Sequence, residues 1–431
     1  MIKKIKAPIL LRGTISPPGD KSISHRAVIF NSIARGNSTI ENFSPGDDCL
    51  ATVDCMKTLG VNIESVEQNM TLHISGAGNN GLTKPNQELN AKNSGTTMRL
   101  LTGLLAAQDF PSTITGDASL CSRPMDRIIK PLNLMGAEII SQGAGSGAPL
   151  IIHGKKLHGI TYHLPMASAQ VKSALILAAL FAENQTTLSE PVRSRDHTEL
   201  LLKTMGAELI NKESSITISP LQLPLSSLDI CIPGDISSAA YWLVAGALHP
   251  DAQLELLNIG VNPTRTGIID VLLEMGANLE IKNRRTQGGE PVADISIKSS
   301  KLKGTTICGP IIPRLIDEIP VLAVAAALAD GITTIKDAAE LRVKESDRIN
   351  TTAQQLAKFG AIIENLPDGM IIQGIKSFSG TECDSMGDHR LAMSLGIAAL
   401  LARGETTINN SEAVNISYPA FWQHAKKISL W

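Results

Sequence analysis

Residues 16–26, SPPGDKSISHR, place Lys21, Ser22 and Arg26 in the expected opening turns of a helix, after two prolines and a glycine. The start of a helix has unpaired backbone N–H groups and a partial positive charge, so cations are unfavourable there unless an anion lies among them. A helical side chain leans toward the N-terminus of its helix, so Arg26 can reach the same point as the Ser22 hydroxyl. This arrangement predicts a phosphate or carboxylate site. For one isolated motif, the alternative is a solvated basic turn.

The same spacing occurs twice more. Gly95 is followed four residues later by Arg99, and Ser168 is followed four residues later by Lys172. Further bases stand in loops that follow β-branched segments: Arg123, Arg193, Arg195, Arg342, Lys344 and Arg348. The repetition favours several anionic groups held by cations. Lys344 and Arg348 are a helical turn apart, so we expect them to share one face. For residues 337–348 the alternative is an exposed charged helix with internal ion pairs.

Two carboxylates among these bases could move protons. Asp317 and Glu345 have cationic neighbours that favour their ionised forms, which makes them candidates for activating a hydroxyl group. Asp388 and His389 are two further titratable residues near the start of another expected helix. For these two we favour structural roles, Asp388 as the N-cap of that helix and His389 as a packed imidazole.

The elements that position these residues come in repeats. One phrase, typified by LKTMGAELI, recurs at glycines 60, 136, 206, 276 and 360, with a period of about 70 to 80 residues. A second phrase, an Ala/Leu-rich helix followed by a turn and a β-branched strand, recurs between them. Each module therefore has two helix-then-strand steps, and six modules span the chain. We expect an α/β protein in which the modules assemble in two groups of three.

Composition excludes several classes of function. The chain has 431 residues, a formal net charge of −2 and only 3% aromatic residues, which argues against bulk attraction to nucleic acid or anionic membranes. The apolar runs are too short for a signal peptide or a membrane span, so we expect a cytoplasmic protein. Six scattered cysteines predict neither zinc nor disulfides. No phosphate-binding P-loop or dinucleotide fingerprint is present in the sequence.

Seven motifs in order resemble the EPSP synthase family of enolpyruvyl transferases: GDKSISHR, NSGTTMRLL, SRPM, SAQVKSA, SRDHTE, LRVKESDR and GDHRLAM. The resemblance extends over residues 16–419. It implies an inverse α/β barrel of two pseudo-threefold domains, each with three βαβαββ repeats and buried parallel helices. It also implies a discontinuous domain, 1–19 and 233–431, that contains both termini. Residues 20–232 would form the second domain, with the active site in the cleft between the two.

The resemblance implies transfer of the enolpyruvyl group from phosphoenolpyruvate to the 5-hydroxyl of shikimate 3-phosphate by addition and elimination, in chorismate and aromatic amino acid biosynthesis. It implies no metal, no organic cofactor and a monomer. Asp317, Glu345 and Lys21 would be catalytic. The residues implied to bind shikimate 3-phosphate are Lys21, Ser22, Arg26, Ser168, Ala169, Gln170, Arg195, Asp317 and Lys344. Those implied to bind phosphoenolpyruvate are Lys21, Gly95, Arg123, Gln170, Arg348 and Arg390.

The sequence departs from one branch of the family at three positions. Ala169 replaces a serine, Glu340 replaces an asparagine and Ile416 replaces a lysine that binds phosphoenolpyruvate. Three alternatives stay open: the sister transferase that acts on UDP-N-acetylglucosamine, an enzyme that processes RNA 3′-phosphate ends, and a repeat scaffold without catalysis. Cys121 separates the first of these, because the sister transferase keeps a reactive cysteine in the corresponding loop.

Overall fold

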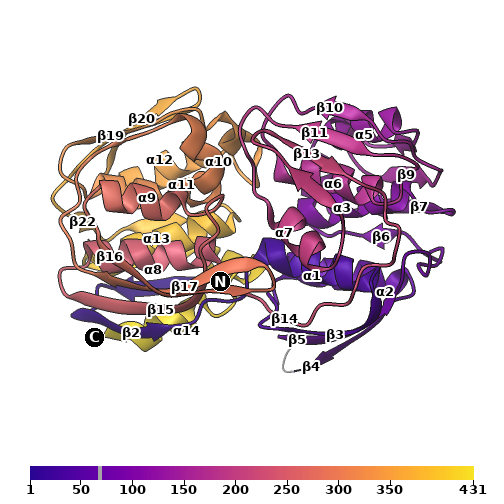
Figure 1. Cartoon of the computed structure of the whole chain (residues 1–431). Helices are drawn as coiled ribbons and strands as arrows, with labels where there is room; N and C mark the ends of the chain where they lie inside the picture. The colour runs from indigo at the N-terminus through magenta and orange to yellow at the C-terminus, as the bar shows by residue number, and fades with distance from the viewer. Residues whose placement is uncertain (67–69) are drawn as a thin grey trace. The chain divides into compact units, whose positions relative to one another are not determined.

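The computed structural model describes residues 1–66 and 70–431, which form two compact units (Figure 1). Unit 1 contains residues 1–18, 233–286 and 291–431, and unit 2 contains residues 19–232 and 287–290. Both termini belong to unit 1, where indigo and yellow segments pack together in Figure 1. Residues 287–290, which we expected in the domain with the termini, group instead with unit 2. The reason is local, since the Glu290 carboxylate lies 2.7 Å from His197 Nδ1.

Unit 2 is built from three four-stranded sheets with the same strand pattern. In each sheet a short edge strand pairs in parallel with the next strand, and two antiparallel pairings follow. The first repeat comprises α1 (Lys21–Ser32), β3 (Arg35–Glu41), α2 (Asp47–Thr58), β4 (Asn62–Val66), β5 (Thr71–Ala77) and β14 (Ile230–Cys231). Strand β14 comes from the end of segment 19–232 and pairs with β3, so the last residues of that segment complete the sheet of the first repeat.

The other two repeats of unit 2 follow in chain order. The second comprises β6 (Leu89–Asn90), α3 (Gly95–Ala106), β7 (Pro111–Thr115), α4 (Ala118–Cys121), α5 (Asp126–Leu134), β8 (Glu138–Ser141), η2 (Ala144–Ser146) and β9 (Leu150–His153). The third comprises β10 (Thr161–His163), α6 (Ala169–Ala179), β11 (Thr186–Ser189), α7 (His197–Thr204), β12 (Leu209–Asn211) and β13 (Ser215–Ile218).

Unit 1 repeats this plan with strands from both ends of the chain. Its first repeat comprises β2 (Leu10–Ile15), α8 (Ile236–Leu248), β15 (Ala252–Gly260), α9 (Gly267–Glu274), β16 (Asn278–Gln287), β17 (Glu290–Lys298) and β26 (Ser429–Leu430). The second comprises β18 (Thr306–Ile307), η3 (Gly309–Ile311), α10 (Ile312–Leu315), η4 (Ile316–Glu318), α11 (Ile319–Ala327), β19 (Ile332–Ile335), η5 (Ala339–Val343), α12 (Arg348–Lys358), β20 (Ile362–Leu366) and β21 (Gly369–Gln373).

The third repeat of unit 1 comprises β1 (Lys3–Lys6), β22 (Phe378–Ser379), β23 (Glu382–Asp384), α13 (His389–Leu401), β24 (Ala402–Arg403), β25 (Glu405–Asn409), η6 (Ser411–Ile416) and α14 (Phe421–Ile428). The N-terminal segment thus supplies β1 to this repeat and β2 to the first, through the pairs β1–β25 and β2–β15. This is why unit 1 is discontinuous in sequence.

Each unit has its own hydrophobic core around three buried helices, α1, α3 and α6 in unit 2 and α8, α11 and α13 in unit 1. Small residues allow these helices to pack closely. A Cβ atom added at Gly103 of α3 would lie 2.1 Å from the carbonyl oxygen of Ala174 in α6. Because the helices are buried on all sides, their polar N-terminal residues are the positions where chemistry can take place.

Candidate active site

Helix α1 begins at Lys21 as its sequence predicted, whereas the contact of Arg26 with Ser22 is to the backbone carbonyl. Asp20 caps the helix by accepting a hydrogen bond from the backbone N–H of Ile23 at 2.9 Å. Lys21 is the first helical residue, and its Nζ forms an ion pair with Asp48 of α2. Lys21 is therefore held at the helix N-terminus by a carboxylate that sequence reasoning did not single out.

Arg26 is buried one turn further along α1, with 3% of its surface exposed. Its guanidinium donates to the Ser22 carbonyl at 2.8 Å and to the hydroxyls of Thr198 and Ser173, each at 2.7 Å. These three acceptors are neutral. Burial lowers the pKa of Arg26 to about 10, although Glu199 and Asp20 oppose the shift. A buried cation among neutral acceptors is stabilised by an anionic ligand.

The N-terminus of α3 gathers three of the residues expected to bind phosphoenolpyruvate. Gly95 is the first helical residue, after the Ser94 cap. Gln170 accepts from Arg99 Nη1 at 2.5 Å and donates to the Thr96 hydroxyl at 3.0 Å. An added Cβ at Gly95 would lie 2.7 Å from Arg99 Nη1 and 3.6 Å from Arg123 Nη1. Gly95, Arg123 and Gln170 therefore surround one helix N-terminus.

Arg123 itself is held in place by its neighbours. Its Nη2 atom donates to the Asn93 side-chain oxygen at 2.7 Å and lies 3.4 Å from the Ser119 hydroxyl. Asn93 also donates to Asp117 at 2.8 Å. Asn93, a part of the NSGTTMRLL motif, thus orients a predicted substrate ligand, a role that the sequence analysis missed.

The third N-terminus of unit 2 corrects one expectation. Ser168 caps α6 and Ala169 is its first residue, as the motif predicted. Lys172 does not face an anion site. Its Nζ is buried between Glu190 at 2.9 Å and Glu199 at 2.8 Å. Burial by itself lowers the pKa of Lys172, but the two carboxylates outweigh it and raise the pKa above its usual value. Arg195 is partly exposed in the loop before α7.

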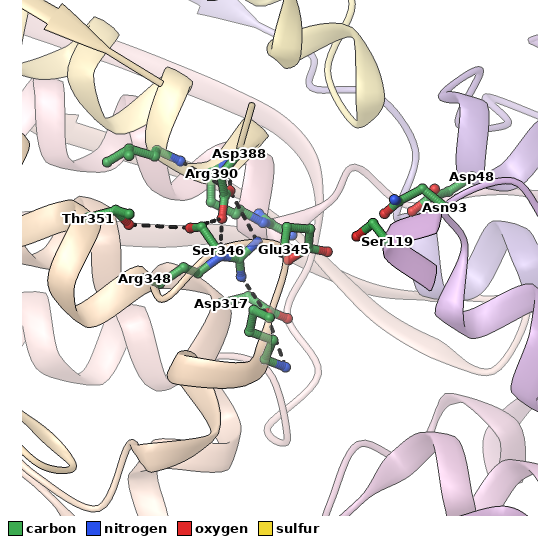
Figure 2. A network of polar contacts seen from close by, with 12 residues as sticks. Asp48, Asn93, Ser119, Asp317, Glu345, Ser346, Arg348, Thr351, Asp388 and Arg390 are labelled. Atoms are coloured by element: carbon green, nitrogen blue, oxygen red, sulfur yellow. Dashed lines mark hydrogen bonds and ion pairs between the residues drawn. The ribbon is translucent and has the colours of Figure 1, made fainter. Parts of the chain in front are cut away.

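In unit 1 the predicted residues gather around Arg348, the first residue of α12 (Figure 2). Its guanidinium lies 2.8 Å from Asp388, 2.7 Å from Glu345 and 3.5 Å from Asp317. Burial by itself lowers the pKa of Arg348, yet Asp388 and Glu345 raise it above the ordinary value. Figure 2 also shows Ser346, which donates to Asp388 at 3.0 Å.

Asp317 lies in the 3₁₀ turn η4, directly before α11. Its Oδ1 atom is 3.9 Å from Lys344 Nζ and 3.5 Å from Arg348 Nη1. The expectation that Lys344 and Arg348 share a helical face is wrong. Lys344 has extended backbone angles after η5, and Asp347 caps α12 by accepting from the Asn350 N–H at 3.1 Å. The two bases instead converge on Asp317 from different elements.

Asp388 caps α13 as expected, accepting from the backbone N–H of Arg390 at 2.8 Å. His389 is buried at 2% exposure. Asp388 has a further role that the sequence did not indicate, because it also anchors Arg348. Burial opposes ionisation of Asp388, but Arg348 lowers its pKa below the usual value. Arg390 is buried in the first turn of α13; burial lowers its pKa, whereas Tyr241 and Asp317 raise it above the ordinary value.

A family model described as EPSP synthase (3-phosphoshikimate 1-carboxyvinyltransferase) matches residues 5–425. The chain belongs to the EPSP synthase family. Curated 3-phosphoshikimate 1-carboxyvinyltransferases from Chloroflexus aurantiacus and Herpetosiphon aurantiacus are 53% and 51% identical to it, over 97% of each chain. The structure of the Acinetobacter baumannii EPSP synthase superposes with a TM-score of 0.90 at 44% identity, covering 100% of this chain and 98% of that one.

The enolpyruvyl transferase NikO from Streptomyces tendae has the same fold, with a TM-score of 0.80 at 18% identity, covering 99% of this chain and 97% of that one. The predicted fold class of an EPSP synthase is thus confirmed. Among the described residues, no group of His, Cys, Asp or Glu side chains is arranged to hold a metal ion. Nor is any helix in the described ranges long and apolar enough to cross a membrane.

The sequence departs from one branch of the EPSP synthase family at Glu340 and Ile416, and the structure shows where these two residues lie. The Glu340 carboxylate lies 3.3 Å from Lys344 Nζ, so it is placed to orient that base. Ile416 is the last residue of the 3₁₀ helix η6 and has no charge to offer an anion. In unit 2, the Cys121 thiol donates to the Gly116 carbonyl at 3.4 Å.

Proposed function

We propose that this chain transfers the enolpyruvyl group of phosphoenolpyruvate to the 5-hydroxyl of shikimate 3-phosphate, releasing phosphate, as its family relatives are named for doing. The observation that best supports this is the buried Arg26 guanidinium, whose hydrogen-bond acceptors are neutral and which an anionic substrate would complement. A monomeric, cytoplasmic enzyme without metal or organic cofactor is part of this proposal.

In this proposal the phosphate of shikimate 3-phosphate binds through residues of unit 2, at the starts of α1 and α6 and in the loop before α7. These are Lys21, Ser22, Arg26, Ser168, Ala169, Gln170 and Arg195. Asp317 and Lys344 of unit 1 contact the same substrate. Phosphoenolpyruvate binds through Lys21, Gly95, Arg123 and Gln170 of unit 2 and Arg348 and Arg390 of unit 1.

The reaction requires three proton transfers, two in the addition and one in the elimination. In the addition, Asp317 accepts the proton of the 5-hydroxyl while that oxygen bonds to C2 of phosphoenolpyruvate and C3 gains a proton to become a methyl group. In the elimination, the methyl group loses a proton and the bond from C2 to the phosphate oxygen breaks. Glu345 and Lys21 serve the protonation of the methylene group and the departure of phosphate. Arg348 lies within 3.5 Å of both carboxylates, so it helps to hold them in place.

One assay tests the proposal. Release of phosphate from phosphoenolpyruvate is measured with shikimate 3-phosphate, with unphosphorylated shikimate and with UDP-N-acetylglucosamine as separate acceptors. We expect release only with shikimate 3-phosphate, together with an enolpyruvyl ether product seen by mass spectrometry. Release with the UDP-sugar instead would assign the chain to the sister transferase.

A further inference from the structure

Lys172 lies beneath the loop that carries Arg195, and its two carboxylate partners come from opposite ends of that loop. Glu190 directly follows β11, and Glu199 lies in the first turn of α7. Residues 191–196, including Arg195, connect them. The Lys172 ammonium group is 2.9 Å from the Glu190 carboxylate and 2.8 Å from that of Glu199, so it ties the two ends of the loop together.

The residue directly before Arg195 is fixed by the same group of side chains. The backbone N–H of Ser194 donates to Glu190 at 3.1 Å, and the Ser194 hydroxyl donates to the same carboxylate. The Ser194 carbonyl lies 3.4 Å from Lys172 Nζ. Both the backbone N–H and the backbone carbonyl of Ser194 are therefore engaged, which restricts the backbone from which the Arg195 side chain extends.

The start of α7 also supports the buried Arg26. Thr198, next to Glu199, accepts from Arg26 at 2.7 Å and is 2.7 Å from the Ser173 hydroxyl, which is adjacent to Lys172. Lys172 and Ser173 of α6 thus contact successive residues of α7. Two predicted phosphate ligands, Arg26 and Arg195, depend on this junction of α6 and α7.

Lys172 is unsuited to binding the substrate itself. It is 2% exposed and already paired with two carboxylates. The cavity beside it, lined by Lys172, Glu190, Arg193 and Glu199 among others, has a volume of about 30 Å³. That volume holds about one water molecule and no phosphate ester.

We propose that Lys172 is a positioning residue, which acts through Arg195 on binding of the phosphate group of shikimate 3-phosphate. This inference rests on the proposed function. Without the ammonium group, Glu190 and Glu199 would be two buried carboxylates that repel each other, and the loop between them would move apart to hydrate them. The backbone of Arg195 would then no longer be held in one position, and the charge-assisted hydrogen bond from its side chain to the phosphate would weaken.

The test is a double-mutant cycle on the full chain, with the dissociation constant of shikimate 3-phosphate measured by calorimetry. We expect Lys172→Met to raise it by about tenfold or more, the size of one charge-assisted hydrogen bond. Lys172→Arg, which can still pair with both carboxylates, should restore most of the affinity. The matched control is Lys130→Met, which removes an exposed lysine paired with Asp126 in the same unit, and it should bind normally.

The cycle separates positioning from a merely structural role. If Lys172 acts through Arg195, adding Lys172→Met to Arg195→Ala should weaken binding little beyond Arg195→Ala alone. Fully additive effects would overturn the proposal, as would normal binding by Lys172→Met. Should Lys172→Met fail to fold, Glu190→Gln provides the same test at conserved volume, and unchanged affinity there would also overturn it. Failure of the wild type to bind shikimate 3-phosphate would instead refute the proposed function.

Discussion

Each unit has a buried arginine near the start of a helix, Arg26 in α1 and Arg348 in α12, but the partners of the two differ. In unit 2, Arg26 donates to two hydroxyls and a backbone carbonyl, and burial lowers its pKa to about 10. In unit 1, Arg348 contacts three carboxylates that raise its pKa. The two units therefore differ in what balances the charge of the buried arginine. An anionic ligand would balance the charge of Arg26, whereas carboxylates of unit 1 balance that of Arg348.

The difference follows from the residues that surround each arginine. Unit 2 has Thr198 and Ser173 beside Arg26, whereas unit 1 has Asp388 and Glu345 beside Arg348. Hydroxyls leave the positive charge of Arg26 available for a phosphate, while the carboxylates around Arg348 offset part of its charge and are held in place by it. Under the proposed function, unit 2 holds most of the substrate-binding residues, and unit 1 supplies two of the three catalytic residues, Asp317 and Glu345.

The largest expected effect concerns folding of unit 1. Arg348→Met leaves Asp388, which is fully buried, without its cation and should cost about 3 to 5 kcal/mol. All three tryptophans, Trp242, Trp422 and Trp431, belong to unit 1, so their fluorescence during urea unfolding reports this unit. Arg26→Met leaves only neutral partners and should cost about 1 to 3 kcal/mol. Far-ultraviolet circular dichroism, which reports both units, measures the loss for Arg26→Met, and equal losses of unfolding free energy in the two variants would contradict the comparison.

The next effect concerns turnover. Asp317→Asn keeps the volume of the side chain near Lys344 and Arg348 but removes its basicity, so the turnover number should fall by about 100-fold or more. Binding of shikimate 3-phosphate should survive, because the phosphate ligands lie in unit 2. Steady-state kinetics together with calorimetry check both parts. Near-normal turnover would show that Asp317 is not the base.

A smaller effect tests the buried interior of unit 2 through pH. Burial is the main cause that lowers the pKa of His25 to about 3, well below the unfolded value of about 6.5. Below pH 6.5 the unfolded state binds a proton that the folded state does not, so His25 costs stability progressively as pH falls from 6.5 toward 3. Asn can keep the hydrogen bond to Thr52, which lies 2.6 Å from His25 Nδ1.

We therefore expect the unfolding free energy of His25→Asn to fall less steeply with decreasing pH than that of the wild type. Well below pH 6.5 the difference in slope should approach about 1.4 kcal/mol per pH unit. Urea unfolding followed by far-ultraviolet circular dichroism between pH 6.5 and 4.5 measures it. Parallel pH profiles would mean that His25 becomes protonated in the folded protein.

Features that depend on neighbouring residues, such as helix starts and caps, could be predicted from the sequence. Contacts between residues far apart in the chain could not. The motifs indicate where the helices that begin at Lys21, Gly95 and Ala169 lie, and the cap at Asp388, because these features depend on neighbouring residues. They do not fix the first residue of α3 or α6. The spacing of Ser168 and Lys172 wrongly predicts that Lys172 holds an anionic ligand, because its partner Glu190 lies 18 residues away in the sequence.

The contact between Lys21 and Asp48 spans 27 residues and has no local sign either. The start of α12, in contrast, has a local signal in the sequence. Asp347 stands directly before Arg348 and is a good N-cap residue, so it could have indicated that the helix begins after Lys344.

The smallest expected effect concerns Cys121, because neither unit needs a thiol for the proposed chemistry. Its Sγ atom donates to the Gly116 carbonyl and lies 3.8 Å from the Thr115 hydroxyl. A serine at this position can keep both contacts, so Cys121→Ser should retain turnover with shikimate 3-phosphate within about twofold, the usual range for a substitution that removes no essential contact.

Fosfomycin, which alkylates the cysteine of the sister transferase, should leave the wild type active. A reactive thiol needs exposure and positive neighbours that stabilise the thiolate. Here the nearby Arg123 is directed to Asn93 at 2.7 Å, and the thiol faces backbone oxygen. Loss of turnover in the serine variant together with inactivation by fosfomycin would show that unit 2 performs covalent chemistry, and the division of labour between the two units would be wrong.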